Sequence, residues 1–401
     1  MTSLNQLLAD ELIDREIDIA RLEAYSRRQA LRLLHDLRSQ LEDRVRAARL
    51  DPTSVTSYKL RRMEQLIRDA SNTIDSNIGE IKRGVNRQIR EIGSFVASDT
   101  TSILNGVIGV DLFRVTLTSN DVRSLADNQV LFGGPLKDWW RKQSTSMKDR
   151  FAREVRMGVA AGETNDQLIR RIRGVRKPGT KVVGVGEQTK TVVDFGGGWY
   201  GKTTNEVEGL VRTSVQSISN DVLMKTYAEN ADILRAVQSV VTFDARTTIT
   251  CISRGGGVWD ILTGESLPES ETDESFPGPP PWHMRCRTTL APVTRSWEDM
   301  IRESSGVSVK LTDSVPTSVR ASMDGKVAGD LSYLKWAERK GDAFLRSKFG
   351  PARYELWKSG KITPAQLIDQ SGRPLSVREL QHMIDSGGSP RNRRAPKPIF
   401  Q

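Results

Sequence analysis

The chain is poor in cysteine, histidine and aromatic residues. Its 401 residues include two Cys, three His and 6% aromatic residues. Two cysteines, Cys251 and Cys286, exclude a disulfide framework and leave a single bridge, a metal site or two plain thiols as alternatives. The few aromatic residues, with a mean hydropathy of -0.45, favour much exposed surface over one compact globule.

Targeting and membrane signals are also missing. The first twenty residues, MTSLNQLLADELIDREIDIA, carry acids where a secretory signal needs a basic start and an apolar core. No uncharged apolar run is long enough to cross a bilayer. We therefore expect a protein that is made in a cytoplasm and has no membrane-spanning segment.

Common catalytic motifs are absent too. The sequence has no HExxH pattern and no GxSxG elbow. The glycine clusters FGGGWY and GGGVWD lack the spacing and the lysine of a phosphate loop, and we interpret them as turns. A Cys and a His three residues apart are not a nucleophile and a base by spacing alone. We expect no catalytic residues and a protein that is not an enzyme.

What the sequence does carry is positive charge. Sixty Lys and Arg against fifty Asp and Glu give a net charge of +10, which favours an acidic partner such as nucleic acid or a negatively charged protein surface. A solvated basic protein without such a partner is the alternative, because both signs are interspersed. The basic tail cannot bury a core, so it is either a disordered solubilising end or a phosphate contact. The residues for that contact would be Arg391, Arg393, Arg394 and Lys397.

Helical periodicity dominates the first hundred residues. One apolar stripe contains Leu31, Leu34, Leu37, Leu41 and Val45, and a second contains Met63, Ile67, Ala70, Ile74, Ile78, Ile81, Val85, Ile89 and Ile92. Two long helices joined by DPTSVT predict an αα-hairpin that packs on itself. The stripes could also serve partner subunits.

The rest of the chain mixes helices with short strands. We predict helices from 120 to 174, a β-hairpin near 181–195, another helix after it, and a buried strand at AVQSVVTFD. The Gly, Pro, Ser and Thr content of residues 245–292 predicts loop and short strand rather than helix, and short helices follow Trp297. The predicted fold class is α+β and predominantly α-helical.

The stretch PPWHMRCRTTLAP, residues 280–292, allows three interpretations. Cys251, His283 and Cys286 offer zinc two thiolates and an imidazole, with Asp244, Asp260 or a water as the fourth ligand. A disulfide between the two cysteines is the second interpretation, which a cytoplasmic origin disfavours. In the third, His283, Arg285 and Arg287 tie the proline loop to backbone carbonyls and carboxylates.

Three motifs in order resemble the phage head morphogenesis family, the Mu F-like minor head proteins. They are LVRTSVQSISNDV, VVTFDARTTITCISRGGGVWD and PGPPPWHMRCRTTLAPV, within residues 167–293. The residues that match are Arg212, Thr213, Asp244, Arg246, Thr247, Cys251, Pro280, Pro281, His283, Cys286 and Arg287. Ser214 stands where the family has Glu, and Thr288 replaces its closing Cys. These departures favour a hydrogen-bonded scaffold over a metal site, and no cofactor is expected besides the zinc alternative.

We expect a division into four parts, of which the resemblance concerns the second and third. Residues 1–115 would form a long helical hairpin that serves as an assembly arm, and residues 116–298 the Mu F-like module with its inserted β-hairpin. Residues 299–385, which look like the C-terminal region of minor head proteins, would form a small helical region. Residues 386–401 are the basic tail.

The resemblance also implies a function in the virion. The expected protein is a minor capsid protein of the phage head near the portal vertex, acting in head assembly and in DNA packaging or ejection. Expected partners are the portal protein, the major capsid or other virion proteins, double-stranded DNA and further copies of the chain. Two rivals remain: a transient assembly scaffold absent from the mature virion, and an enzyme such as an ADP-ribosyltransferase-like effector.

Overall fold

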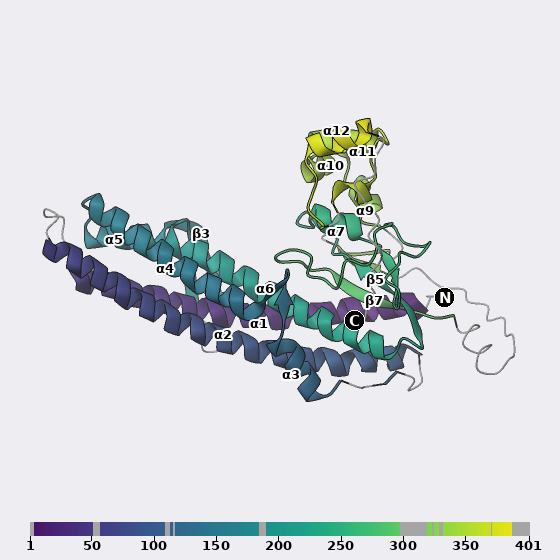
Figure 1. Ribbon diagram of the computed structural model, residues 1–401, viewed down its shortest axis with the longest axis horizontal. Helices are drawn as coiled ribbons and strands as arrows, with labels where there is room; N and C mark the ends of the chain where they lie inside the picture. The colour runs from purple at the N-terminus through teal and green to yellow at the C-terminus, as the bar shows by residue number, and fades with distance from the viewer. Residues whose placement is uncertain are drawn as a thin grey trace. The chain divides into compact units, whose positions relative to one another are not determined.

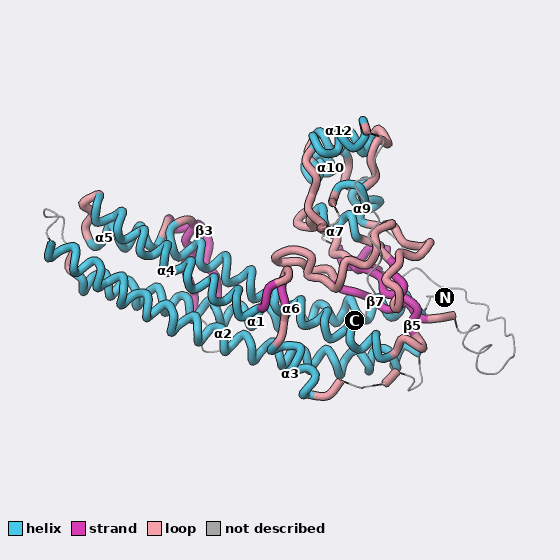
Figure 2. Tube along the Cα trace, viewed as in Figure 1, coloured by secondary structure: helices cyan, strands magenta, loops and turns pink. Residues whose placement is uncertain are grey.

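The computed structural model describes residues 4–50, 57–108, 113–114, 117–183, 190–296, 319–322, 325–328, 332–369 and 371–386. In these residues, eleven α-helices account for most of the regular structure, and nine strands are short (Figure 2). The predicted fold class, predominantly helical α+β, is confirmed. Across the same residues, no helix combines the length and the apolar character that a membrane crossing requires.

The chain forms two compact units, each assembled from separated segments. The sheet unit comprises Met1–Asp18, Gly93–Leu125 and Gln216–Gln401, and the helical unit comprises Ile19–Ile92 and Ala126–Val215. Three helices contribute residues to both units: α1 (Leu4–Ala48), α2 (Ser57–Ile108) and α6 (Gly198–Glu229). The sequence predicted parts made of contiguous residues, with boundaries in loops. The two compact units instead consist of separated segments, and several of their boundaries fall within helices.

In the helical unit, α1 and α2 lie side by side (Figure 1). Every residue of the two predicted apolar stripes is buried, so the two long helices are confirmed. The segment that joins them, residues 51–56, lies outside the described residues. Ser144 of α4 (Leu136–Ala160) donates a hydrogen bond to Asp75 of α2. Arg212 of α6 donates to Glu23 of α1 at 3.1 Å. Apolar stripes and polar contacts therefore hold the helices together.

Local signals set the elements between α4 and α6. Gly162, with a φ of +69°, follows α4, and a capping box of Thr164 and Gln167 starts α5 (Asn165–Arg173). Strands β3 (Val175–Val183) and β4 (Lys190–Gly196) pair antiparallel. The β-hairpin expected near 181–195 is thus confirmed, and its first strand begins earlier than expected, at Val175.

Two short elements near the start of α4 complete this region. Helix α3 (Ser119–Asp127) is followed by a two-residue hairpin of β1 (Val130–Leu131) and β2 (Gly134–Pro135). The prediction of helix throughout residues 120–174 was therefore wrong at β1 and β2, which lie between α3 and α4. Four strand residues are too few to produce a visible period of two.

The sheet unit is built on a three-stranded antiparallel sheet. Its strands are β5 (Leu234–Val240), β6 (Val258–Asp260) and β7 (Thr289–Thr294), in the order β6-β5-β7. The predicted buried strand is β5, which lies at the centre. One prediction here was wrong: residues 245–292 contain the short helix α7 (Ile249–Arg254), which begins because Thr248 accepts a hydrogen bond from the Cys251 amide.

The C-terminal elements belong to the same unit. They are β8 (Val319–Ser322), β9 (Gly325–Ala328), α9 (Tyr333–Arg339), α10 (Asp342–Phe349), α11 (Pro351–Lys358), η2 (Pro364–Leu367) and α12 (Val377–Asp385). The β8-β9 pair was not expected, whereas the short helices were. Phe243 and Ile252 share one apolar core with Trp336, Phe349 and Leu380. The C-terminal helices and the end of β5 therefore share one core.

Candidate functional site

The residues of the second and third motifs meet next to β7. Asp244 and Thr247 lie in the loop after β5, Cys251 lies on α7, and His283 and Cys286 lie in the loop before β7. Arg246 belongs to the same loop, but its side chain is exposed. Segments about forty residues apart in the sequence thus form one site inside the sheet unit.

An ion pair joins the two loops. Arg287 donates to both carboxylate oxygens of Asp244, from Nη1 to Oδ2 at 2.5 Å and from Nη2 to Oδ1 at 2.8 Å. The backbone amides of Arg246 and Thr247 donate to Oδ1 as well. Burial opposes ionisation of Asp244, but these donors and the Arg287 charge outweigh it and hold its pKa at about 2. The carboxylate is therefore ionised and fixed in place.

The C-terminal helices hold the same loop from its other side. Tyr333 of α9 donates its hydroxyl hydrogen to the Asp244 carbonyl oxygen at 3.1 Å. Lys348 of α10 donates to the carbonyl oxygen of Ala245 at 3.0 Å. Sequence reasoning missed both residues, because nothing in their local pattern indicates a contact about a hundred positions away.

Two thiols and an imidazole form a cluster beside the ion pair. The Cys251 sulfur lies 3.6 Å from the Cys286 sulfur and 3.0 Å from His283 Nε2. Both cysteines are 3% exposed, and His283 is half-buried. Both are free thiols, so the disulfide interpretation does not hold here. The Thr288 hydroxyl, 3.2 Å from the Cys251 sulfur, completes the group.

Hydrogen bonding orients the imidazole and distinguishes the two thiols. His283 Nδ1 lies 2.8 Å from the Met284 carbonyl oxygen, which only accepts, so Nδ1 donates and Nε2 faces the sulfur. The Cys251 hydrogen bond and His283 lower the pKa of Cys286, whereas the Cys286 hydrogen bond and burial raise that of Cys251. Burial would lower the pKa of His283, but Cys286 outweighs it and raises that pKa. Cys286 is therefore the more acidic of the two thiols.

The distances within the cluster are close to those of a zinc site. Zinc bonds of about 2.3 Å to sulfur and about 2.05 Å to nitrogen, in a tetrahedron, place two sulfurs about 3.8 Å apart and sulfur and nitrogen about 3.6 Å apart. The observed 3.6 Å and 3.0 Å need shifts of about half an ångström or less. The three ligand atoms all lie within 4.8 Å of one another. Cys251, His283 and Cys286 therefore fit a zinc ion.

The predicted carboxylate ligands do not join the cluster. Asp244 is held by Arg287, and Asp260 accepts hydrogen bonds from the amides of Leu262 and Thr263. Among the described residues, the metal-binding group comprises the two cysteines and the histidine alone. In the part of the chain that the structure describes, this group thus offers three ligands of the four that a structural zinc site uses.

The matching residues of the first motif lie in the helical unit. Arg212 pairs with Glu23, and Thr213 is fully buried with its hydroxyl donating to the Gly209 carbonyl oxygen. Ser214, where the resembled family has Glu, is fully buried too, and its carbonyl oxygen accepts from Gln129. The side chains of Arg212 and Thr213 are thus engaged in helix packing.

Two further features match the interpretation of the proline loop as architecture. The Trp282 side chain packs against Val241 and the two cysteines, and its indole N–H donates to the Gly278 carbonyl oxygen. Trp282 therefore anchors the loop before His283, and Arg287 anchors it after His283. Pro281 follows Pro280 through a cis peptide bond.

One glycine cluster, GGGVWD, contains a turn, as predicted, whereas FGGGWY joins β4 to α6 through a bend at Gly197. Gly256, with a φ of +71°, lies between α7 and β6, and Gly198, with a φ of +56°, lies at the start of α6. A Cβ at Gly198 would come within 2.7 Å of the Gly174 amide nitrogen. Glycine is needed there for both conformation and space.

No family model, curated protein or solved structure matches the chain. The resemblance to Mu F-like proteins therefore depends on the three motifs and on the C-terminal stretch within residues 299–385. The basic tail residues Arg391, Arg393, Arg394 and Lys397 lie outside the described residues.

Proposed function

We propose that the chain is a minor head protein of a tailed phage, located near the portal vertex and acting in head assembly and in DNA packaging or ejection. The observation that carries the proposal is the Asp244-Arg287 ion pair, which joins the second and third resembling motifs. Residues that match the family pattern are thus those that hold the loops of this module together. Its role would be structural rather than catalytic.

Arg246 is the motif residue best placed to contact a partner. Its side chain is exposed, whereas Asp244, Thr247 and Arg287 are engaged within the module. A docking role for the motif surface therefore predicts that Arg246 matters for binding and little for folding. The proposed partner is the portal protein, and other virion proteins and further copies of the chain are the remaining candidates.

A pull-down with the cognate portal protein tests this proposal. Wild type and Arg246→Ala would be compared with Arg123→Ala, which removes an exposed arginine of α3 in the same unit. Loss of portal binding in the first variant alone supports docking at the motif surface. Absence of binding by the wild type would remove the portal from the proposal. Mass spectrometry of purified virions would separate a resident minor protein from a transient scaffold.

A second surface supports contact with double-stranded DNA. Residues 137–202 contain fifteen Lys and Arg against seven Asp and Glu, so this part of the chain holds most of the positive excess. On α4, the basic residues that face other helices are paired: Lys148 with Asp75 and Arg150 with Glu206. The remaining excess therefore lies at the surface.

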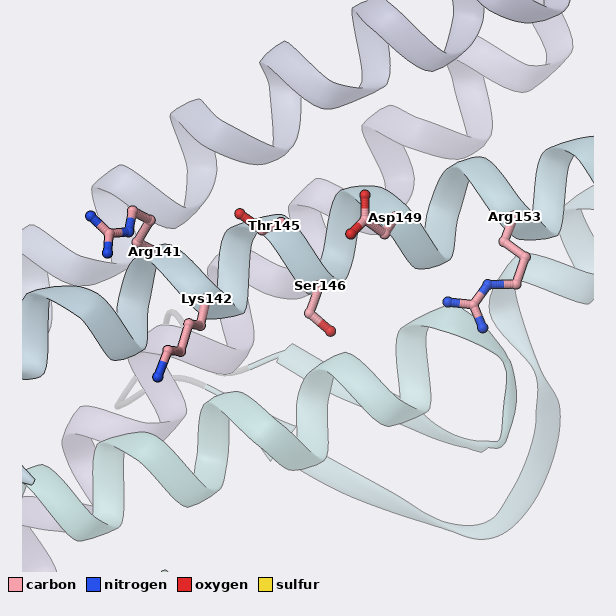
Figure 3. A pocket seen from close by; sticks show the side chains of 6 residues that line it. All are labelled: Arg141, Lys142, Thr145, Ser146, Asp149 and Arg153. Carbon is pink, nitrogen blue, oxygen red and sulfur yellow. The ribbon is translucent and has the colours of Figure 1, made fainter. Parts of the chain in front are cut away.

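The exposed face of α4 has the composition of a phosphate-binding surface. Arg141 and Lys142 lie at one end and Arg153 at the other, with two hydroxyls between them (Figure 3). With Thr145, Ser146 and Asp149 they line a shallow hollow of about 360 Å³. Arg141 and Arg153 are about 18 Å apart along the helix at about 1.5 Å per residue. Cations and hydroxyls at this spacing can reach several phosphates of one strand.

A further inference from the structure

We propose that Cys251, His283 and Cys286 bind one zinc ion with three protein ligands, and that its fourth position lies next to Thr288. The inference goes beyond the proposed function and does not depend on it. It concerns this chain in particular, because Thr288 occupies the position at which the resembled family has a third cysteine.

The ligand geometry is the first argument. The two sulfurs and Nε2 converge from α7 and from the loop before β7, and the distances between them are close to those of a tetrahedral site. The His283 ring is already oriented by its hydrogen bond to the Met284 carbonyl oxygen. Metal-bound histidines typically donate their second ring nitrogen in this way. The ligands are thus arranged before any ion binds.

Charge is the second argument. A buried thiolate is costly without a positive partner. Arg285 and Arg287 flank Cys286 in the sequence, and Arg287 already forms two hydrogen bonds with Asp244. Two buried thiolates would balance the charge of one divalent zinc ion, and a set of two sulfurs and an imidazole nitrogen suits zinc better than magnesium or calcium.

The position of Thr288 is the third argument. Its hydroxyl lies 3.2 Å from the Cys251 sulfur, and its side chain is 1% exposed. A cysteine there would place a third thiolate at the edge of the cluster. With threonine, the group supplies three of the four ligands of a tetrahedral zinc ion, and the fourth would be a small group such as one water.

Metal analysis of the full chain is the direct test. The protein would be purified with a reductant, incubated with zinc chloride and exchanged into metal-free buffer, and zinc would be counted by mass spectrometry. One zinc per chain is expected. A folded wild-type chain without stoichiometric zinc would overturn the proposal, as would Cys251 and Cys286 recovered as a disulfide. This measurement requires no variant to fold.

Variants assign the ligands. Cys251→Ser, Cys286→Ser and His283→Asn each remove a proposed ligand, so each is expected to weaken zinc binding. Removing only the hydrogen-bond partner of a ligand lowers metal affinity roughly 10–100-fold, and removing the ligand itself should lower it more. His382→Asn removes an exposed histidine of α12 and serves as the control. Zinc that remains bound to a folded Cys286→Ser chain would contradict the assigned ligands.

Thr288→Cys tests the fourth position. Substituting cobalt for zinc gives a charge-transfer absorption that grows with the number of thiolates bound. The variant is expected to bind zinc more tightly and to show a stronger cobalt-thiolate absorption, whereas Thr288→Ser should leave both unchanged. If Thr288→Cys changes neither the zinc affinity nor the cobalt-thiolate absorption, the fourth position does not lie beside residue 288.

Discussion

Asp244 and Arg287 lie 43 residues apart in the sequence, yet they form an ion pair with two hydrogen bonds of 2.5 and 2.8 Å. The pair connects the end of β5 to the start of β7, two strands that are hydrogen-bonded neighbours. It therefore fastens the proline loop, which contributes His283 and Cys286 to the Cys-His-Cys cluster, to the loop that follows β5.

Breaking this pair should destabilise the sheet unit. Hydrogen bonds to charged groups contribute about 1.5–3 kcal/mol, so Arg287→Ala should lower the free energy of unfolding by about that amount. Urea unfolding followed by circular dichroism measures it. Arg246→Ala is the control, with an expected change within about 0.5 kcal/mol, as is usual at exposed sites. Equal stability of the two variants would contradict the role given to the pair.

The same carboxylate predicts a dependence on pH. The folded-state pKa of Asp244, about 2, lies below the value of about 3.9 expected in an unfolded chain. Its contribution to stability is therefore fully present above about pH 4 and is lost as the pH falls toward 2. Unfolding curves between pH 5 and 2, at about half-unit steps, should fall more steeply for wild type than for Asp244→Asn. Parallel curves would count against an ionised, paired Asp244.

The basic face of α4 should control DNA affinity and its dependence on salt. Replacing Arg141, Lys142 and Arg153 with Ala should weaken binding to duplex DNA. It should also reduce the slope of log affinity against log salt by about 0.9 for each phosphate that the variant no longer neutralises. Fluorescence anisotropy at several salt concentrations gives both quantities.

The matched control replaces three exposed arginines elsewhere in the helical unit, Arg44, Arg61 and Arg87, and so removes the same charge. If the two triple variants lose affinity equally, overall charge rather than the α4 face accounts for binding. If the wild type does not bind DNA, the DNA part of the proposed function fails, and the zinc proposal is unaffected.

Close helix packing predicts opposite effects for two glycines of α2. A Cβ at Gly93 would lie 2.8 Å from Val122 Cγ1 and 3.2 Å from Ile218 Cγ1, so Gly93→Ala should destabilise by about 1–3 kcal/mol. At Gly84 the space is open, and Gly84→Ala should stabilise by about 0.5–1 kcal/mol, because alanine restricts the unfolded chain and favours helix. Thermal unfolding of the two variants and the wild type measures both changes in stability. A neutral Gly93→Ala would mean that the contact with α3 is looser than described.

The sequence by itself determined the local elements. The apolar stripes predicted α1 and α2, the alternation of β-branched residues predicted the β3-β4 hairpin, and a continuous apolar run predicted β5. Each is set by spacing within one segment, which the sequence displays directly. The ties expected of His283 and Arg287, to a backbone carbonyl and to a carboxylate, are also found. The candidate residues themselves were recognisable because Cys and His are rare in this chain.

Only the tertiary structure decided which of these residues meet. Cys251 joins His283 and Cys286 because a six-residue helix, unrecognised in a segment rich in Gly and Pro, turns its side chain toward the later loop. Asp244 and Asp260, equal candidates as zinc ligands in the sequence, are both engaged elsewhere. Tyr333 and Lys348 reach the Asp244 loop from helices about a hundred residues away. Such contacts depend on how distant segments pack around shared cores. The spacing of residues within one segment does not predict which distant segment that segment will contact.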